Sequence, residues 1–123
     1  MSLPSNVESR LAAREAAATA VLDANRAAER RVAVAESCTG GMVCAALTDI
    51  AGSSDVFSSG FITYSADAKR AQLEVSGEIL ETFGEVSLAT AWAMAAGALA
   101  KSDADVAVAI TGIAGPGGGS EKK

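Results

Sequence analysis

The sequence predicts an α/β fold, a three-layer sandwich in which helices cover a mainly parallel central sheet. Two observations lead to this prediction. Short apolar runs typical of buried strands alternate with longer stretches of helical composition. Two of these runs lead directly into glycine-rich turns, at residues 36–41 and 111–119. In a parallel sheet such turns lie beyond the carboxyl ends of the strands, where ligands bind.

Length and composition are those of one cytoplasmic domain. The chain has 123 residues, which we treat as a single domain over residues 1–123. Half of the residues are apolar but only 4% are aromatic, so Ala, Val, Leu and Ile must build the core. No apolar run approaches the roughly 18 residues that span a bilayer, and no signal-peptide pattern is present. We therefore expect a cytoplasmic protein without a membrane partner.

Charge and missing residue types narrow the chemistry. The net charge is −5 and no basic cluster is longer than Arg30-Arg31, which argues against a nucleic-acid partner. Backbone N–H groups can still hold a small anion without any net positive charge. With no histidine and only two cysteines, we expect no metal site. A general base must then be a carboxylate, a lysine, a tyrosine or an activated water.

The first part of the chain predicts a long helix, a strand and a second helix. Residues 5–29 carry apolar side chains at helical spacing and contain no Pro or Gly, whereas residues 1–4 are expected to be disordered. Residues 31–35 form a short β-branched run closed by polar residues and glycines, which indicates a buried strand that leads into a turn. Residues 42–50 then have helical composition.

The middle of the chain predicts a second strand and two short helices. The strand covers residues 56–64, and Gly60 within it marks a bulge or a close approach of another segment. The helices cover residues 66–73 and 76–83, and Gly84 follows the second at a position typical of helix ends.

The last part predicts a long helix and a third strand. Residues 87–101 begin at Ser87, a favourable N-cap. Apolar side chains then recur at helical spacing, at Leu88, Ala91, Trp92, Ala95, Ala96 and Leu99. Residues 106–110 form a continuous apolar run, so we expect a strand that is buried on both faces.

The first glycine-rich turn contains a candidate nucleophile, Ser37. A helix N-terminus exposes unpaired N–H groups that suit a phosphate or an oxyanion. The structural alternative is that Ser37 or Thr39 caps the next helix while the glycines reverse the chain. Cys38 is a rival nucleophile that ranks below the serine, because no histidine is present to lower its pKa. Cys44 is expected in the core.

The second turn and one lysine complete the candidate site. Thr111-Gly112 directly follows the third predicted strand, where backbone approaches a ligand; the alternative is a mobile surface loop. Lys69 is a candidate base only if desolvation or nearby positive charge keeps its amine neutral, and the alternative is an ordinary solvated lysine. Tyr64 precedes it by five residues, at a strand end, and is placed to share a hydrogen bond with it.

Several motifs in this order resemble the CinA C-terminal domain family. They are residues 35–41 (AESCTGG), 52–54 (GSS), Tyr64-Ser65 with Lys69, Gly84-x-Val86-Ser87, in which x is any residue, and 111–118 (TGIAGPGG). The resemblance implies hydrolysis of the carboxamide of nicotinamide mononucleotide to nicotinate mononucleotide and ammonia, within pyridine nucleotide salvage. It implies a serine–lysine amidohydrolase that uses neither a metal nor an organic cofactor.

Carried onto this chain, the resemblance makes Ser37 the nucleophile and Lys69 its base, with Tyr64 as a third catalytic residue. It places a set of residues from the two turns around the substrate: Glu36, Thr39, Gly40, Gly41, Thr111 and Gly112. The N–H groups of residues 39–41 would hold either the oxyanion or the phosphate. The expected partner is a small nucleotide substrate, and the apolar helices and low aromatic content allow a homodimer.

The chain departs from the family pattern in two places. Members have an asparagine where this chain has Ala66, and they continue past the Ser-Glu-Lys stretch into further strands, a helix and a site arginine. We therefore expect the C-terminal elements of the domain to be absent here, which would leave an open apolar sheet edge.

Two alternatives to catalysis stay open. One is a non-catalytic module that binds a nucleotide or phosphate while Lys69 stays protonated. The other is a competence-associated regulatory protein, which predicts a large exposed apolar patch and no well-formed pocket. A Lys69 pKa near the unperturbed value of about 10.4 would favour binding over catalysis.

Overall fold

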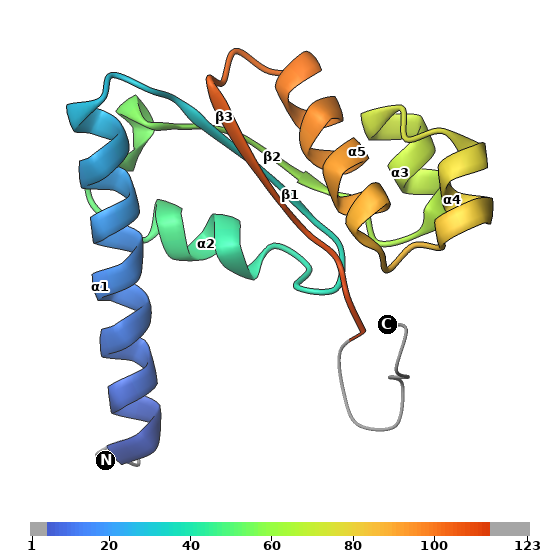
Figure 1. Ribbon diagram of the computed structural model, residues 1–123. Coiled ribbons are helices and arrows are strands. Elements are labelled where there is room, and N and C mark those ends of the chain that lie inside the picture. Colours follow the sequence, from blue (N-terminus) through green and yellow to red (C-terminus); the bar gives the residue numbers. More distant parts are fainter. Residues whose placement is uncertain (1–4, 114–123) are drawn as a thin grey trace.

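The computed structural model describes residues 5–113, and Figure 1 shows a central sheet with helices on both of its faces. Along the chain the elements are α1 (Ser5–Ala27), β1 (Val32–Glu36), α2 (Met42–Thr48), the 3-10 turn η1 (Ser53–Asp55), β2 (Phe57–Ile62), α3 (Ala66–Leu73), α4 (Gly77–Phe83), α5 (Leu88–Ala100) and β3 (Val106–Ile110). The predicted fold class is therefore confirmed. The predicted disorder of residues 1–4 and the part of the second glycine-rich turn beyond residue 113 lie outside the described residues.

The sheet is parallel, and β1 is its central strand. The strand order is β2-β1-β3, so β1 pairs with both of the others. In the register of the sheet, Val34 lies opposite Gly60 on β2 and opposite Val108 on β3. The carboxyl ends of the strands therefore meet at one edge of the sheet, as the positions of the glycine-rich turns predicted.

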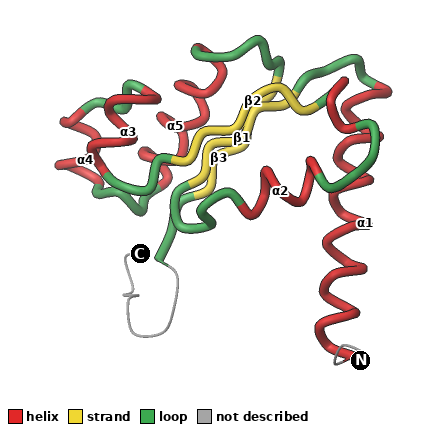
Figure 2. Tube along the Cα trace, turned by 180° about the vertical axis from the view of Figure 1, so that it is seen from behind, coloured by secondary structure: helices red, strands yellow, loops and turns green. Residues whose placement is uncertain are grey.

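Every residue of β1 is buried, as predicted for this run, and its side chains alternate between two cores. Val32 and Val34 face the side covered by α1 and α2, and Ala33 and Ala35 face the opposite side. Figure 2 shows α1 and α2 on one side of the strands and α3, α4 and α5 on the other. The first core adds Ala18, Leu22, Leu47 and Val56. The second adds Leu73, Val75, Met94 and Ala98.

Two glycines let segments approach more closely than any side chain would allow. A Cβ atom at Gly60 would lie 2.6 Å from Cys44 Sγ, which confirms the predicted close approach at this position. A Cβ atom at Gly97 on α5 would overlap the carbonyl oxygen of Leu73 at the end of α3. Small residues at these positions therefore set the distance of α2 and of α3 from their neighbours.

Serine side chains cap the N-termini of α3, α4 and α5, the three helices that cover one face of the sheet. Ser65 caps α3, Ser76 caps α4 and Ser87 caps α5, each accepting a hydrogen bond from the N–H three residues later at 3.0–3.1 Å. The predicted N-cap at Ser87 is thus confirmed. Because the cap at Ser65 fixes where α3 begins, it also fixes the position of Lys69 one turn later.

Two expectations about exposure are wrong. The apolar run of β3 is not buried on both faces, because β3 is an edge strand that pairs only with β1 among the described residues, and Val108 is 50% exposed. The apolar stripe predicted along α5 is not the face that α5 buries. Leu88 is 91% and Trp92 79% exposed, whereas the helix packs through Met94, Gly97 and their neighbours.

The helices within residues 5–113 do not have the combination of length and hydrophobicity that crossing a membrane requires. The longest, α1, covers 23 residues but carries charged side chains along its length, such as Arg10, Glu15 and Asp23.

Candidate active site

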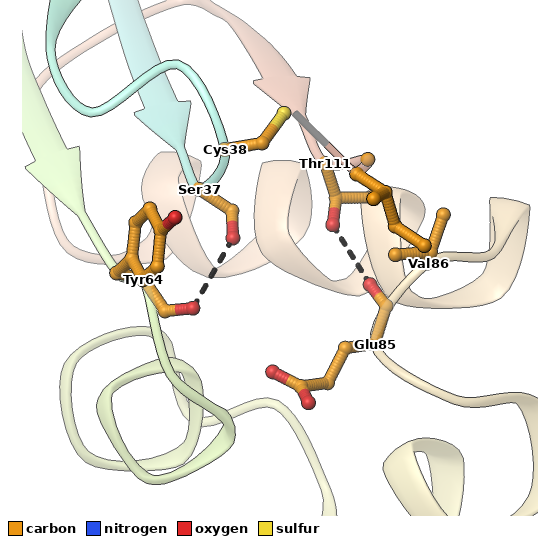
Figure 3. Close-up of a pocket in the computed structure, with 8 residues that line it drawn as sticks. Ser37, Cys38, Tyr64, Glu85, Val86 and Thr111 are labelled. Carbon is orange, nitrogen blue, oxygen red and sulfur yellow. Dashed lines mark hydrogen bonds between the residues drawn. The ribbon is translucent and has the colours of Figure 1, made fainter. Parts of the chain in front are cut away.

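A cavity of about 360 Å³ lies at the carboxyl edge of the sheet (Figure 3). It is lined by Ser37, Cys38, Tyr64, Glu85, Val86, Thr111, Gly112 and Ile113. The first two residues follow β1, Tyr64 follows β2, and the last three follow β3. The two turns that the sequence predicted to lie at one edge of the sheet therefore do line one pocket.

Ser37 and Lys69 are in direct contact. Ser37 is the first residue after β1, and its N–H donates to the carbonyl of Ile110 on β3 at 2.9 Å, which holds it at the sheet edge. The Nζ atom of Lys69, which reaches in from α3, lies 2.9 Å from Ser37 Oγ. This distance is within the range of about 2.6–3.2 Å expected for a nucleophile and its base.

The amine of Lys69 is enclosed by the protein. The residue is 0% exposed, and Nζ also lies 2.9 Å from the carbonyl oxygen of Thr63 and 3.4 Å from that of Tyr64. Burial lowers the pKa of Lys69 below its ordinary value, while the Glu85 carboxylate and the Cys38 thiol offset part of that shift. The alternative of a solvated lysine is therefore wrong.

The neighbours of the amine suit both of its protonation states. An ammonium group has three N–H donors, and the three acceptors around Nζ are Ser37 Oγ and the carbonyls of Thr63 and Tyr64. A neutral amine needs only the two carbonyls for its protons, so its lone pair is free to accept the Ser37 proton. A group that must take up and return a proton requires this dual arrangement.

Glu36 was predicted to bind the substrate, but its side chain is fully buried and accepts hydrogen bonds from neighbouring residues of the protein. Its Oε1 accepts hydrogen bonds from Thr39 Oγ1 at 2.6 Å and from the N–H groups of Gly41 and Val43, both at 3.1 Å. Its Oε2 accepts from the N–H of Cys44 at 2.9 Å. Burial raises the pKa of Glu36, but the hydrogen bonds outweigh burial and bring it down to about 2.

This carboxylate changes the expected role of the first turn. The N–H groups at the start of α2 were expected to hold a phosphate or an oxyanion, but those of Gly41 and Val43 donate to Glu36, and that of Gly40 donates to the carbonyl of Ser37 at 3.0 Å. The hydroxyl of Thr39 is likewise taken by Glu36. The physical reason is that a buried charge must be paired, and a helix N-terminus is a ready partner for an anion.

The two glycines of this turn serve the backbone. Gly40 has a φ of +58° and Gly41 a φ of +105°, in the left-handed region that favours glycine. The structural alternative given for these residues therefore holds for the glycines, whereas Ser37 points into the pocket.

Tyr64 contributes to the site differently from the expectation. Its backbone carbonyl, and not its hydroxyl, is the group that lies within hydrogen-bond distance of Lys69 Nζ and of Ser37 Oγ, 3.4 Å from each. The ring lines the pocket and is largely exposed. It is therefore placed to contact a ligand.

Thr111 lies on the other side of the pocket from Tyr64 (Figure 3), and Gly112 also lines the pocket. Thr111 Oγ1 donates to the carbonyl of Glu85 at 2.8 Å. A Cβ atom at Gly112 would lie 3.3 Å from Cys38 Sγ, so this glycine keeps space beside the first turn.

Sequence reasoning missed Glu85, which lines the pocket and lies 3.8 Å from Lys69 Nζ, measured from Oε1. A single glutamate between a helix and a serine cap is an ordinary surface residue, so composition carries no signal for it. Its position is the unspecified one in the motif Gly84-x-Val86-Ser87, so the motif carries no signal for it either.

The two cysteines lie in different surroundings. Cys38 lines the pocket beside Ser37. Cys44 is only half-buried, and burial together with the Glu36 carboxylate raises the pKa of its thiol to about 12. Within residues 5–113, no group of three or more His, Cys, Asp or Glu side chains is placed to hold a metal ion.

The family model and the similar proteins all indicate one family. The family described as the CinA C-terminal domain matches residues 14–123. A CinA-like protein from Chlorobium phaeovibrioides is 52% identical over 103 residues, which are 84% of this chain and 24% of the relative. A protein from Caldicellulosiruptor bescii, named a competence-damage inducible protein, is 55% identical over 93 residues, 76% of this chain and 23% of the relative. The chain thus spans about a quarter of the length of these curated relatives.

Solved structures show the same fold. A competence/damage inducible protein from Agrobacterium tumefaciens superposes with a TM-score of 0.84 at 54% identity, over 89% of this chain and 67% of that one. A CinA superfamily protein from Escherichia coli gives a TM-score of 0.83 at 40% identity, over 86% of this chain and 62% of that one.

Proposed function

The chain belongs to the CinA C-terminal domain family, and on that premise we propose that it is a serine–lysine amidohydrolase that converts nicotinamide mononucleotide to nicotinate mononucleotide and ammonia. The contact of 2.9 Å between Lys69 Nζ and Ser37 Oγ supports this proposal most strongly. It pairs a hydroxyl at a pocket wall with a buried amine, in a chain that has no histidine. The substrate and the serine–lysine mechanism are taken from the family resemblance, and the geometry of the site supports the mechanism.

In the first half of the reaction, Ser37 Oγ attacks the carboxamide carbon. The neutral amine of Lys69 takes the hydroxyl proton as the new carbon–oxygen bond forms. The carbon–nitrogen bond then breaks, and Lys69 gives its proton to the departing nitrogen, which leaves as ammonia. The acyl group remains on Ser37 as an ester.

In the second half, a water molecule attacks the ester carbon. Lys69 takes a proton from this water and returns it to Ser37 Oγ as the ester bond breaks. The products are the acid and the free enzyme. Over both halves one amide and one water become one acid and one ammonia, and the lysine ends in the neutral state in which it began.

The surroundings support this cycle in two ways. The carbonyls of Thr63 and Tyr64 hold the amine in place through both protonation states, so little rearrangement accompanies the proton transfer. The pocket volume of about 360 Å³ is at the small end of the range of about 300–1,000 Å³ for ligand sites. A volume of this size suits the nicotinamide ring, which carries the carboxamide.

The proposal is tested by ammonia release from nicotinamide mononucleotide. Ser37→Ala is expected to abolish turnover, because no other group forms the ester. Lys69→Met is expected to lower kcat by about 10²–10⁴-fold, the usual contribution of a general base. Matched controls are Ser54→Ala and Lys101→Met, which make the same changes at exposed positions outside the pocket and should leave turnover unchanged.

A Ser37→Ala variant that keeps its circular dichroism spectrum and its turnover would contradict the assignment of the nucleophile. If the wild-type chain binds the nucleotide without releasing ammonia, the non-catalytic alternative replaces the amidase.

A further inference from the structure

Glu85 is held at a defined place on the rim of the pocket. Its carbonyl oxygen accepts from Thr111 Oγ1 at 2.8 Å, which ties its backbone to the end of β3. The preceding carbonyl, of Gly84, accepts from the hydroxyls of Ser87 at 3.1 Å and Thr90 at 2.6 Å at the start of α5. These contacts fix the backbone of Glu85 and therefore the direction in which its side chain leaves the loop.

That direction is toward the candidate base. Figure 3 shows the Glu85 side chain extending from its loop toward the side of the pocket where Ser37 and the carbonyl of Tyr64 lie. Its Oε1 is 3.8 Å from Lys69 Nζ, which is within the distance of an ion pair but longer than a hydrogen bond. Among the described residues, Glu85 is the one carboxylate that forms an ion pair with this amine.

The remaining neighbours of the amine carry no fixed charge. The end of β2 contributes the carbonyls of Thr63 and Tyr64, and the first turn contributes Ser37 Oγ. The one other titratable group with an effect on Lys69 is the thiol of Cys38. The balance between the charged and neutral forms of Lys69 is therefore set by burial against Glu85, with Cys38 as the lesser influence.

Burial alone would make a poor base. An amine that is fully desolvated resists protonation, so it gains the serine proton only at a high cost in free energy. A catalytic base works best when its pKa is near the working pH. A carboxylate at 3.8 Å favours the ammonium form and reduces that cost without occupying the position that faces Ser37.

We propose that Glu85 is a positioning residue that stabilises Lys69 while the amine carries the proton of Ser37. This role rests on the proposed function, in which Lys69 takes that proton. Glu85 acts through Lys69 and forms no bond to the substrate. Its half-exposed carboxylate also leaves it in contact with the solvent that supplies water for the second half of the reaction.

A measurement on Lys69 tests the proposal without relying on activity. The lysines of the chain are Lys69, Lys101, Lys122 and Lys123, so a 13C spectrum of lysine Cε groups is simple, and Lys69→Met assigns the signal. Titration of Glu85→Gln should give a lower Lys69 pKa than the wild-type chain, because removing the carboxylate disfavours the ammonium form. Glu85→Asp, which keeps the charge, should move the value back toward wild type.

The chain offers a matched control in Glu74→Gln. Glu74 Oε1 lies 3.3 Å from Lys101 Nζ on the surface, so this variant removes the same charge from beside another lysine. It should leave the Lys69 pKa where it is. A Lys69 pKa that is the same in Glu85→Gln as in the wild type overturns the proposal.

The pH profile of kcat/KM gives the second readout. Its acidic limb should move to lower pH in Glu85→Gln, in step with the Lys69 pKa, and the plateau should fall by less than the roughly 10²–10⁴-fold of a lost base. A purely structural role for Glu85 would lower the rate at every pH without moving the limb, and that result overturns the proposal. A shifted Lys69 pKa in a chain that hydrolyses no amide contradicts the proposed function alone.

Discussion

Two ionisable side chains, Glu36 and Lys69, are fully buried but have opposite surroundings. Glu36 is met by N–H and O–H donors, so it keeps its negative charge at a pKa of about 2. Lys69 is met by carbonyls and a hydroxyl, and burial lowers its pKa. The first residue is therefore fixed and structural, whereas the second can exchange a proton.

Replacing Glu36 by Gln should destabilise the fold. A glutamine keeps only one of the two acceptor oxygens, so its NH2 group would face a donor that a carboxylate oxygen now accepts from, such as the N–H of Cys44. We expect the free energy of unfolding to fall by about 1–3 kcal/mol, the cost of leaving a buried polar group unpaired. Urea unfolding measures the change, and Glu81→Gln at an exposed position is the control, with an expected change near zero.

The stability of the wild-type chain and that of Glu36→Gln should depend differently on pH. The pKa of Glu36 is about 2 in the folded chain, below the ordinary value of 4.5, so its contribution is fully present above pH 4.5 and is lost as the pH falls toward 2. The stability gap between wild type and Glu36→Gln should therefore close over this window. A gap that is the same at pH 6 and near pH 2.5 would contradict the charged state assigned to Glu36.

At the scale of elements, the second face of the sheet depends on how closely α5 packs on the end of α3. Gly97 makes this contact possible, because a Cβ atom there would overlap the carbonyl of Leu73. The contact matters for the site as well, since α3 carries Lys69 and α5 begins just after Glu85. Packing of these two helices therefore places both groups relative to the pocket.

Gly97→Ala should destabilise the chain by about 1–3 kcal/mol, the usual effect of overpacking a core. Gly77→Ala is the matched control, because its Cβ would meet nothing closer than 3.6 Å and glycine is a poor helix former. It should leave stability unchanged or raise it by about 0.4–1 kcal/mol. Urea midpoints compare the two variants. Equal effects of the two substitutions would contradict the close approach at Gly97.

Sequence patterns predicted most elements but did not predict how β3 and α5 are buried. The bounds of α3 are those predicted; Ser65 caps its start, and Glu74, with a φ of +56°, ends it. The exposure of β3 was wrong, because an apolar run reads alike in a central and in an edge strand. The buried face of α5 was also wrong, because alanines on all sides of the helix let Met94 and Gly97 pack while Trp92 stays exposed.

Within the site, the sequence indicated which residue types could act but not which side chains would form hydrogen bonds or ion pairs with one another. A chain without histidine needs another base, which is why Lys69 was a candidate before its contact with Ser37 was known. Nothing local indicated that Glu36 would occupy the helix N-terminus or that Glu85 would face the amine. Both facts depend on segments that meet only when the sheet forms.

At the scale of the whole molecule, the parallel sheet brings distant segments to one edge. Ser37, Tyr64 and Thr111 each follow a different strand, and the side chain of Lys69 reaches Ser37 from α3. Helices from the first and second halves of the chain cover opposite faces and leave this edge to the loops. The desolvation of one amine is therefore a property of the entire fold.

The pKa of Lys69 in the wild-type chain is the most direct test of this account. Titration of its Cε signal by 13C NMR gives the value directly. The account predicts that Lys69 loses its proton below the ordinary lysine pKa of about 10.4. A Lys69 pKa at or above that ordinary value would contradict the claim that an uncharged amine faces Ser37.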